Sequence, residues 1–212
     1  GLHKILREKG DSMGRKVAII GATGTIGSAV ADRFEKHYEV LRVSRHSTPQ
    51  VDMSDVDSIR AFYKEAGPLD AIVVCAGFAP FSHLTDLSRE DFSAAATGKL
   101  LGQVSLVTEG LSYLNDGGSF TLTTGILSQH PIAGSAAASM ANGGVESFVT
   151  AASTELPRGQ RINAVSPTVL KEATGFHSAF PGFKQVPATE VADAYIRSVE
   201  GVETGKVFQV WN

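Results

Sequence analysis

The chain has 212 residues, of which 42% are hydrophobic and 19% are charged. These values are typical of one globular domain with a sizeable core, and they exclude disordered and fibrous classes of protein. The net charge is −3 and the lysines and arginines are scattered along the chain, which argues against a nucleic-acid partner or an electrostatic membrane surface.

Cysteine usage and hydropathy indicate the cellular compartment in which the protein is expected. The single cysteine, Cys75, lies in an apolar run with no second ligand at metal-like spacing, so we expect neither a disulfide nor a metal site. No window approaches the roughly 18 apolar residues of a membrane helix, and no signal-peptide pattern is present. The sequence therefore predicts a cytoplasmic protein with a mixed-charge N-terminal tail over residues 1–14.

The folded pattern begins with a short β-branched apolar run at Lys16–Ile20, as expected for a strand buried on both faces of a parallel sheet. Apolar residues at helical spacing predict a helix over 25–38, and residues 39–44 return to strand character. This first segment predicts one strand-helix-strand unit.

The alternation of helix and strand continues after this unit. Ser54 or Asp55 is expected to cap a helix that runs to Ala66, and residues 70–75 form the next apolar strand. Ser88 and Asp91 have the spacing of a capping box, which predicts the start of a long helix over 88–114.

The C-terminal half repeats the pattern. Asn115, Asp116, Gly117 and Gly118 predict a turn before a strand over 119–124. A helix rich in small residues is expected over 134–156, followed by a strand over 162–166. Thr189 is expected to cap the last helix, and residues 207–211 form the last strand. The alternation predicts a doubly wound parallel α/β sheet of about seven strands with helices on both faces.

A glycine-rich loop follows the first strand and opens the first helix. The loop reads Gly21, Ala22, Thr23, Gly24, Thr25, Ile26 and Gly27. Gly21 permits a tight turn, Gly24 permits close approach of a ligand, and Gly27 lets the helix pack on the sheet. This placement predicts that backbone N–H groups and the helix N-terminus bind the pyrophosphate of a dinucleotide. The alternative is that the glycines only turn the chain.

The end of the second strand indicates which dinucleotide is bound. NAD enzymes usually place an acid there to bind the ribose 2′-hydroxyl, whereas this chain has Ser44 and Arg45, followed by His46. Arg45 can form paired hydrogen bonds with a 2′-phosphate, which favours NADP(H). The alternative is a solvated surface arginine.

Several separated motifs resemble the short-chain dehydrogenase/reductase family over residues 16–211. Besides the glycine loop, they are Asp52-Met53, Cys75-Ala76-Gly77 and the segment Arg161–Pro167. The resemblance implies that Asp52 and Met53 contact adenine and that Cys75, Ala76, Gly77 and Pro167 also belong to the cofactor site. It further implies one Rossmann-type domain over residues 15–212, with a short substrate lid around 168–188.

The family's active site has a tyrosine general acid, a lysine four residues later, a serine and an asparagine. No tyrosine of this chain is followed by a lysine at that spacing. Alignment with the family pattern places Lys99 at the asparagine position, Gly125 at the serine position, Ala138 at the tyrosine position and Asn142 at the lysine position. Alanine and glycine have no side chain that donates a proton, so the usual mechanism is not expected.

Four polar residues are candidates for the missing chemistry. Lys99 or His130 could supply a proton, and Thr124 could orient a carbonyl group, with Ser128 as a supporting hydroxyl. The alternatives are a solvent-facing helix lysine and a surface-loop histidine. Aromatic residues of the expected lid could face a substrate or could pack the lid onto the core. These lid candidates are Phe176, His177, Phe180 and Phe183.

Two functions follow from these residues. The first is an NADP(H)-dependent oxidoreductase that transfers a hydride to or from a small carbonyl or alcohol with a non-standard active site. The alternative is a catalytically silent NADP(H)-binding sensor or regulatory module. The resemblance also implies a homodimer or homotetramer formed through the helices expected over 88–114 and 134–156. A third reading, a fold that binds no nucleotide, conflicts with the intact glycine loop.

Overall fold

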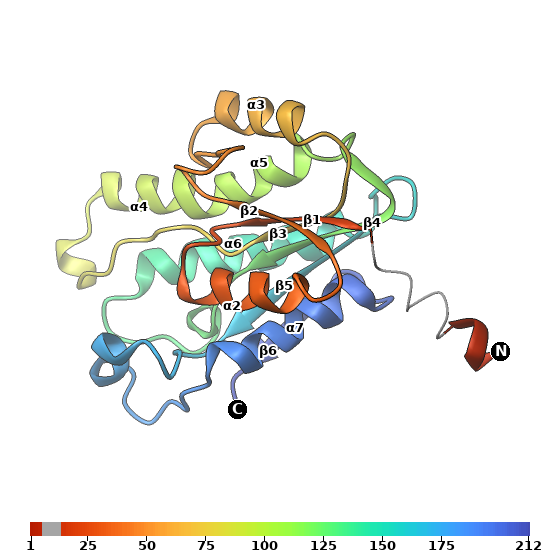
Figure 1. Ribbon diagram of the computed structural model, residues 1–212. Helices are drawn as coiled ribbons and strands as arrows, with labels where there is room; N and C mark the ends of the chain where they lie inside the picture. Colours follow the sequence, from red (N-terminus) through yellow and green to blue (C-terminus); the bar gives the residue numbers. More distant parts are fainter. Residues whose placement is uncertain (6–13) are drawn as a thin grey trace.

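The computed structural model of the protein describes residues 1–5 and 14–212. Residues 6–13, which belong to the predicted N-terminal tail, lie outside the described part. The sheet in the described part has six parallel strands in the order β2-β1-β3-β4-β5-β6 (Figure 1). The strands are β1 (Lys16–Ile20), β2 (Glu39–Val43), β3 (Leu69–Val74), β4 (Leu114–Thr123), β5 (Arg161–Pro167) and β6 (Val207–Val210).

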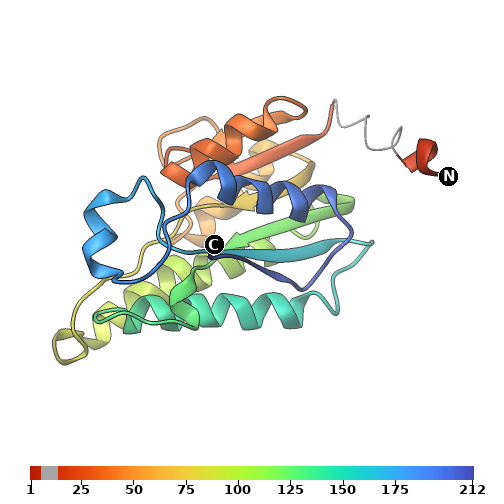
Figure 2. The same cartoon turned by 90° about the horizontal axis from the view of Figure 1, so that it is seen from below.

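Helices cover both faces of the sheet, as Figures 1 and 2 show. One face carries α2 (Thr25–Phe34) and α7 (Ala188–Glu200), and the other carries α3 (Val56–Ala66), α5 (Gly102–Thr108) and α6 (Ala136–Ala152). Other helical segments are α4 (Arg89–Ala95), the π-helical η2 (Ala96–Leu101), and the short 3₁₀ turns η1 (Leu84–Asp86), η3 (Ile126–Ser128) and η4 (Thr174–Ala179). The predicted doubly wound parallel α/β fold is confirmed, with six strands in place of about seven.

Strand β1 illustrates why the apolar runs have no polar alternation. Successive side chains of a strand point to opposite faces of the sheet. Val17 and Ile19 pack in the core under α2 and α7, whereas Ala18 and Ile20 pack in the core under α3, α5 and α6. Both faces are buried, so every residue of this run after Lys16 is apolar.

Two predicted helix starts are confirmed, and one predicted helix is shorter than expected. Asp55 caps α3 by accepting a hydrogen bond from the Asp57 N–H, and Ser88 forms the capping box with Asp91. The helix expected over 88–114 instead consists of α4, η2 and α5, which ends at Thr108. The chain turns at Gly110, where a Cβ atom would lie 2.5 Å from the Tyr63 hydroxyl.

Two local predictions need correction. The predicted turn over 115–118 lies within β4, because Leu114 already pairs with Leu69 of β3 and the register then shifts before Ser119 pairs with Ala71. Thr189 does not cap the last helix. Helix α7 begins at Ala188, whose N–H donates to both carboxylate oxygens of Glu172 at 3.1 and 3.0 Å.

The sheet topology determines where a ligand can bind. The chain leaves β1 for β2 on one side, whereas β3 lies on the other side of β1. In such sheets, ligands bind beyond the carboxyl ends of the strands at this switch point. None of the described helices is both long and apolar enough to cross a membrane. Assembly into a dimer or tetramer stays a prediction.

Candidate functional site: a dinucleotide groove and an adjoining cavity

The glycine loop connects β1 to α2, as the sequence predicts. Its three glycines differ in whether the fold leaves space for a side chain at their positions. Gly21 has a φ of +86°, and a Cβ atom there would lie 2.8 Å from Ala76. A Cβ atom on Gly27 would lie 1.9 Å from the Gly21 carbonyl oxygen. A Cβ atom on Gly24 would make only an ordinary 3.5 Å contact. The fold therefore requires Gly21 and Gly27, whereas it leaves room for a side chain at Gly24.

Helix α2 presents its N-terminus at this loop. Gly24 is the N-cap residue, and no side chain caps the helix. The first N–H groups of a helix have no partner within the helix, and together with the helix dipole they attract anions. The loop thus has a backbone conformation and a polarity that fit the pyrophosphate of a dinucleotide.

A groove of about 650 Å³ extends from this loop toward β2 and the end of β3. Most of the predicted cofactor residues line it. They are Gly21, Thr23, Ser44, Arg45, Asp52, Met53, Ala76 and Gly77. Gly24, Thr25, Ile26 and Gly27 form the adjacent start of α2. Cys75 and Pro167 are not among the groove residues, and Pro167 instead lines the neighbouring cavity.

Arg45 lines this groove, and its guanidinium makes only a weak contact with another side chain. Its side chain is 72% exposed, and its Nη2 atom is 3.9 Å from Asp52 Oδ1, which is a weak surface ion pair. The Asp52 Oδ1 atom also accepts hydrogen bonds from the hydroxyl and the N–H of Ser54, and these bonds lower the pKa of Asp52. Arg45 therefore retains donors for an anionic ligand.

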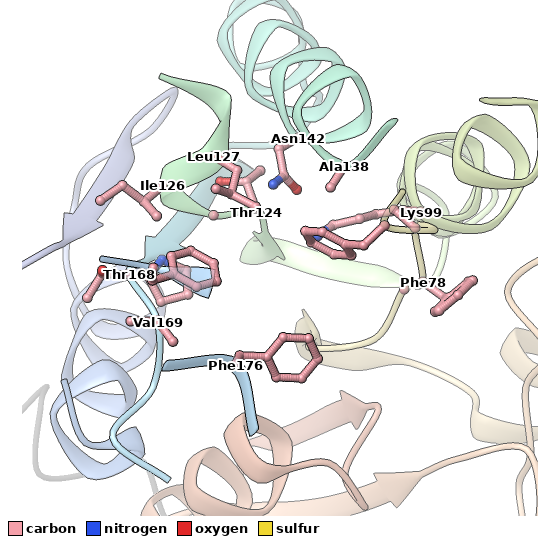
Figure 3. Close-up of a pocket in the computed structure, with 16 residues that line it drawn as sticks. Phe78, Lys99, Thr124, Ile126, Leu127, Ala138, Asn142, Thr168, Val169 and Phe176 are labelled. Carbon is pink, nitrogen blue, oxygen red and sulfur yellow. The ribbon is translucent and has the colours of Figure 1, made fainter. Parts of the chain in front are cut away.

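A second cavity, of about 310 Å³, adjoins the groove at Gly77 and Phe78, which line both (Figure 3). The four positions that align with the family's active-site residues come together here, since all of them line this cavity. They are Lys99 on η2, Gly125 after β4, and Ala138 and Asn142 on α6. Figure 3 shows Ala138 and Asn142 on α6 beside Lys99, with Phe176 on the opposite side of the cavity.

Two polar atoms of the cavity wall lack partners. Thr124 Oγ1 and Asn142 Oδ1 are buried, and neither makes a hydrogen bond within the described part of the chain. A buried polar atom without a partner costs about 1–3 kcal/mol. A ligand with a polar group at this wall would remove that cost.

Lys99 is the single ionisable residue among the described residues that line this cavity. Burial lowers the pKa of Lys99 to about 8, and the negative charge of Glu146 partly offsets this effect. The aliphatic part of Lys99 packs against Gly77, where a Cβ atom would lie 3.0 Å from Lys99 Cγ. Lys99 also lies on a π-helical segment, a type of distortion that is frequent at functional sites.

The structure does not place His130 near Lys99 and Thr124, the other two predicted catalytic residues. His130 is exposed, it is not among the residues that line the cavity, and its ring packs edge-on against Trp211 at 5.1 Å between ring centroids. The chain turns after β4 so that Ile126 and Leu127 line the cavity instead. Of the three predicted catalytic residues, Lys99 and Thr124 therefore lie together and His130 lies apart.

Cys75 directly follows β3 and is partly buried against the core under α2 and α7. Burial raises the pKa of its thiol to about 12, although hydrogen bonds with Tyr195 and Thr123 oppose this rise. The hydroxyl groups of Thr123 and Tyr195 are 2.5 Å apart, and Thr123 donates to the Val74 carbonyl at 2.6 Å. All four tyrosines lie in the described part of the chain, and none of them lines the cavity.

The segment 168–188, which the sequence predicts to be a lid, contributes residues to the cavity. Phe176 and Phe180 line it, whereas Phe183 packs edge-on against Phe180 and His177 Nε2 hydrogen-bonds with the Leu170 carbonyl at 2.9 Å. Thr168 and Val169, at the start of the same segment, also line the cavity. The sequence analysis missed several other lining residues, namely Phe78, Ala79, Phe81, Ile126 and Leu127. Their one sequence signal is their position after the ends of β3 and β4.

Comparison with known proteins agrees with this geometry. The family model for enoyl-(acyl carrier protein) reductase matches residues 11–208. The chain belongs to the short-chain dehydrogenase/reductase family. Among solved structures, the protein lin1944 from Listeria innocua is 48% identical, with a TM-score of 0.92 over 93% of this chain and 100% of that one.

Two further structures of this family are similar along nearly their whole length. A small-chain dehydrogenase is 29% identical, with a TM-score of 0.80 over 93% of this chain and 96% of that one. A small-chain dehydrogenase in complex with NADPH is 27% identical, with a TM-score of 0.85 over the same shares. No curated protein matches the sequence.

Proposed function

We propose that this short-chain dehydrogenase/reductase is an NADP(H)-dependent oxidoreductase acting on a small carbonyl compound or the corresponding alcohol. One observation carries the proposal. The dinucleotide groove opens at Gly77 and Phe78 into a cavity whose wall holds Lys99 beside the unpartnered atoms of Thr124 and Asn142. A cofactor site that leads into a mostly apolar pocket with a few convergent polar groups is typical of an active site.

The residues of the groove fit NADP(H). The N–H groups at the start of α2 would hold the pyrophosphate, and Gly24, which the fold itself does not require, would allow its close approach. Ser44 and Arg45 would hold the 2′-phosphate, and Asp52 and Met53 would lie beside the adenine. The NADPH complex of a 27% identical relative supports this choice of nucleotide.

The cavity residues would position the substrate and move a proton. When bound, the cofactor supplies a hydride to the carbonyl carbon or accepts one from the alcohol carbon. The Thr124 hydroxyl would orient the carbonyl oxygen by donating a hydrogen bond. The Lys99 ammonium would donate the proton that turns this oxygen into a hydroxyl, and the neutral amine would accept it in the reverse reaction. A lysine with a pKa of about 8 can do both near neutral pH.

The second candidate is a catalytically silent NADP(H)-binding module. Its support is that Ala138 and Gly125, which the sequence alignment assigns to the positions of the family's tyrosine and serine, both line the cavity. Without a proton-donating side chain at these positions, the groove would bind nucleotide while the cavity performs no reaction.

The test is a calorimetric titration of the purified chain with NADPH and NADH. We expect NADPH to bind more tightly, and Arg45→Ala to weaken NADPH at least about tenfold while NADH changes little. Arg60→Ala is the matched control, because Arg60 is an exposed arginine that pairs with Glu109 outside the groove. Equal affinities for both nucleotides, or none, would contradict the choice of NADP(H).

Turnover then separates the two candidates. NADPH consumption with a panel of small aldehydes and ketones is expected for the wild-type chain, and Lys99→Met should reduce it about a hundredfold or more. Tight NADPH binding with no turnover of any compound would favour the silent module.

A further inference from the structure

Three aromatic side chains lie exposed around the mouth of the cavity. Phe78 is 72% exposed, Phe176 is 55% exposed and Phe81 is 48% exposed, yet all three line the cavity. Phe81 follows β3 and Phe176 lies on η4, and the centroids of their rings are 6.5 Å apart. A cluster of large, solvent-exposed apolar side chains at a cavity entrance indicates contact with a ligand rather than core packing.

The interior of the cavity divides into an apolar part and one polar wall. Ile126, Leu127, Val169 and Phe180 provide apolar surface. The hydroxyl of Thr168 already donates to the Lys184 carbonyl at 3.0 Å, so it has no proton left to donate to a ligand. The polar groups that remain are those of Thr124, Asn142 and Lys99, which come from neighbouring elements of one side (Figure 3). A matching ligand has an apolar body and a single polar end.

The volume limits the size of that body. A cavity of roughly 150 Å³ holds one benzene molecule. The present cavity is about 310 Å³, which suits a molecule of one ring or a branched chain together with its polar group.

The charges on the polar wall favour an uncharged ligand. Lys99 already experiences the negative charge of Glu146, one helical turn beyond Asn142 on α6. Glu146 Oε1 accepts a hydrogen bond from the Ser128 hydroxyl at 2.8 Å, whereas its buried Oε2 has no partner in the described part of the chain. Glu146 does not itself line the cavity, but its negative charge acts on Lys99. A carboxylate ligand would bring a second negative charge, and it would bring further acceptors to a wall on which Asn142 Oδ1 already lacks a donor. An alcohol can donate to such acceptors, and its carbonyl form adds no charge.

We propose that the cavity binds a compact, uncharged ketone or aldehyde, or the corresponding alcohol, that carries one aromatic or branched apolar group. The apolar group lies against the paired rings of Phe81 and Phe176, and the carbonyl oxygen faces Thr124 and Lys99. This inference rests on the proposed function. In the reduction, the carbonyl carbon gains a hydride from NADPH and the oxygen gains a proton from Lys99, which gives the alcohol and NADP⁺.

The experiment compares two probes that differ in charge at one position. Acetophenone has a methyl group where benzoylformate has a carboxylate. Binding of each is measured by ligand-observed saturation-transfer NMR with NADP⁺ present, so that no reduction occurs, and again without nucleotide. NADPH consumption with each probe is recorded separately. We expect acetophenone to bind at least about tenfold more tightly than benzoylformate and to be the probe that is reduced.

Two variants test the position of the ring. Phe81→Ala and Phe176→Ala should each weaken acetophenone about twofold to tenfold, the range expected for one aromatic contact. Leu84→Ala is the control, because Leu84 is 69% exposed and lies three residues after Phe81 in the sequence but does not line the cavity. Both aromatic residues are exposed, so their replacement is not expected to unfold the chain.

The outcomes distinguish this inference from the proposed function. If NADPH binds and benzoylformate is preferred, or neither probe binds, the inferred substrate class is wrong while the cofactor assignment stands. If NADPH does not bind but acetophenone binds without nucleotide and depends on Phe81 and Phe176, the ligand class is supported and the proposed reaction is not. Acetophenone binding that both aromatic variants leave unchanged would overturn the inferred position.

Discussion

The carbonyl oxygen of Gly21 lies 1.9 Å from the point where a Cβ atom of Gly27 would be, at the junction of β1 and α2. This distance is far below any contact that a real Cβ atom makes, so the first turn of α2 can approach the loop only if residue 27 is glycine. Gly24 lies between these two residues and has no such restriction, because its Cβ atom would be 3.5 Å from the same oxygen and its φ is −76°.

The two glycines should therefore respond differently to alanine. Gly27→Ala is expected to destabilise the fold by about 3 kcal/mol or more, since the obstructing atom is backbone. Gly24→Ala should change stability by less than about 0.5 kcal/mol but weaken NADPH at least about tenfold. Urea unfolding and calorimetric titration measure the two effects. Normal NADPH affinity in Gly24→Ala would mean that the ligand does not approach this position closely.

The sequence predicts the layers of this fold well because its central strands, such as β1 and β3, are buried on both faces. An apolar run such as Lys16–Ile20 needs no knowledge of its neighbours to be recognised as a strand. Helix ends are different, since they depend on distant residues. Just beyond the end of α5, Gly110 leaves space for the Tyr63 side chain, and at the start of α7 the Ala188 N–H donates to Glu172. Neither partner is close in the sequence.

Site residues that belong to a sequence motif can be predicted from the sequence. Site residues that only the fold brings together cannot. Alignment to the family pattern finds Lys99, and the structure brings it to the cavity together with Thr124. The apolar lining cannot be found in this way, because residues such as Ile126 and Val169 look like ordinary core residues in the sequence. His130 is polar and follows β4, as a site residue would, but the turn at η3 directs it toward Trp211.

Cys75 should be inert in the folded protein. Burial raises the pKa of its thiol from 9.0 to about 12, and the thiolate is the reactive form. Near about pH 8, its reaction with Ellman's reagent should be roughly a thousandfold slower in the native chain than in the guanidinium-unfolded chain. The unfolded chain serves as its own control for reagent and concentration. Native reactivity within about tenfold of the unfolded rate would show that the thiol is accessible and ionised.

Replacement of Lys99 by methionine should stabilise the protein at neutral pH. The folded-state pKa of about 8 is lower than the unfolded value of 10.5, so the native state holds this proton less tightly. The cost of burying the charge is complete below pH 8 and disappears between pH 8 and 10.5. With allowance for partial exposure, Lys99→Met should raise the free energy of unfolding by roughly 2 kcal/mol near neutral pH and by little at high pH.

Urea unfolding of Lys99→Met at a series of pH values measures this gain. Lys64→Met is the matched control, because Lys64 is an exposed lysine on α3 and its replacement should change stability by less than about 0.5 kcal/mol. A gain that does not diminish as the pH rises would show that better packing, rather than loss of a buried charge, is responsible.

The rates of reduction and oxidation should depend on pH in opposite ways if Lys99 exchanges the proton. Reduction of a carbonyl uses the ammonium form, so its rate should fall as the pH rises through about 8. Oxidation of the alcohol uses the neutral amine, so its rate should rise through the same pH. Glu146→Gln removes a negative charge that raises the pKa of Lys99, and both profiles should therefore move to lower pH. Initial rates in both directions, measured at saturating nucleotide, give the profiles. Profiles that do not move in Glu146→Gln, or that persist in Lys99→Met, would assign the proton transfer to another group.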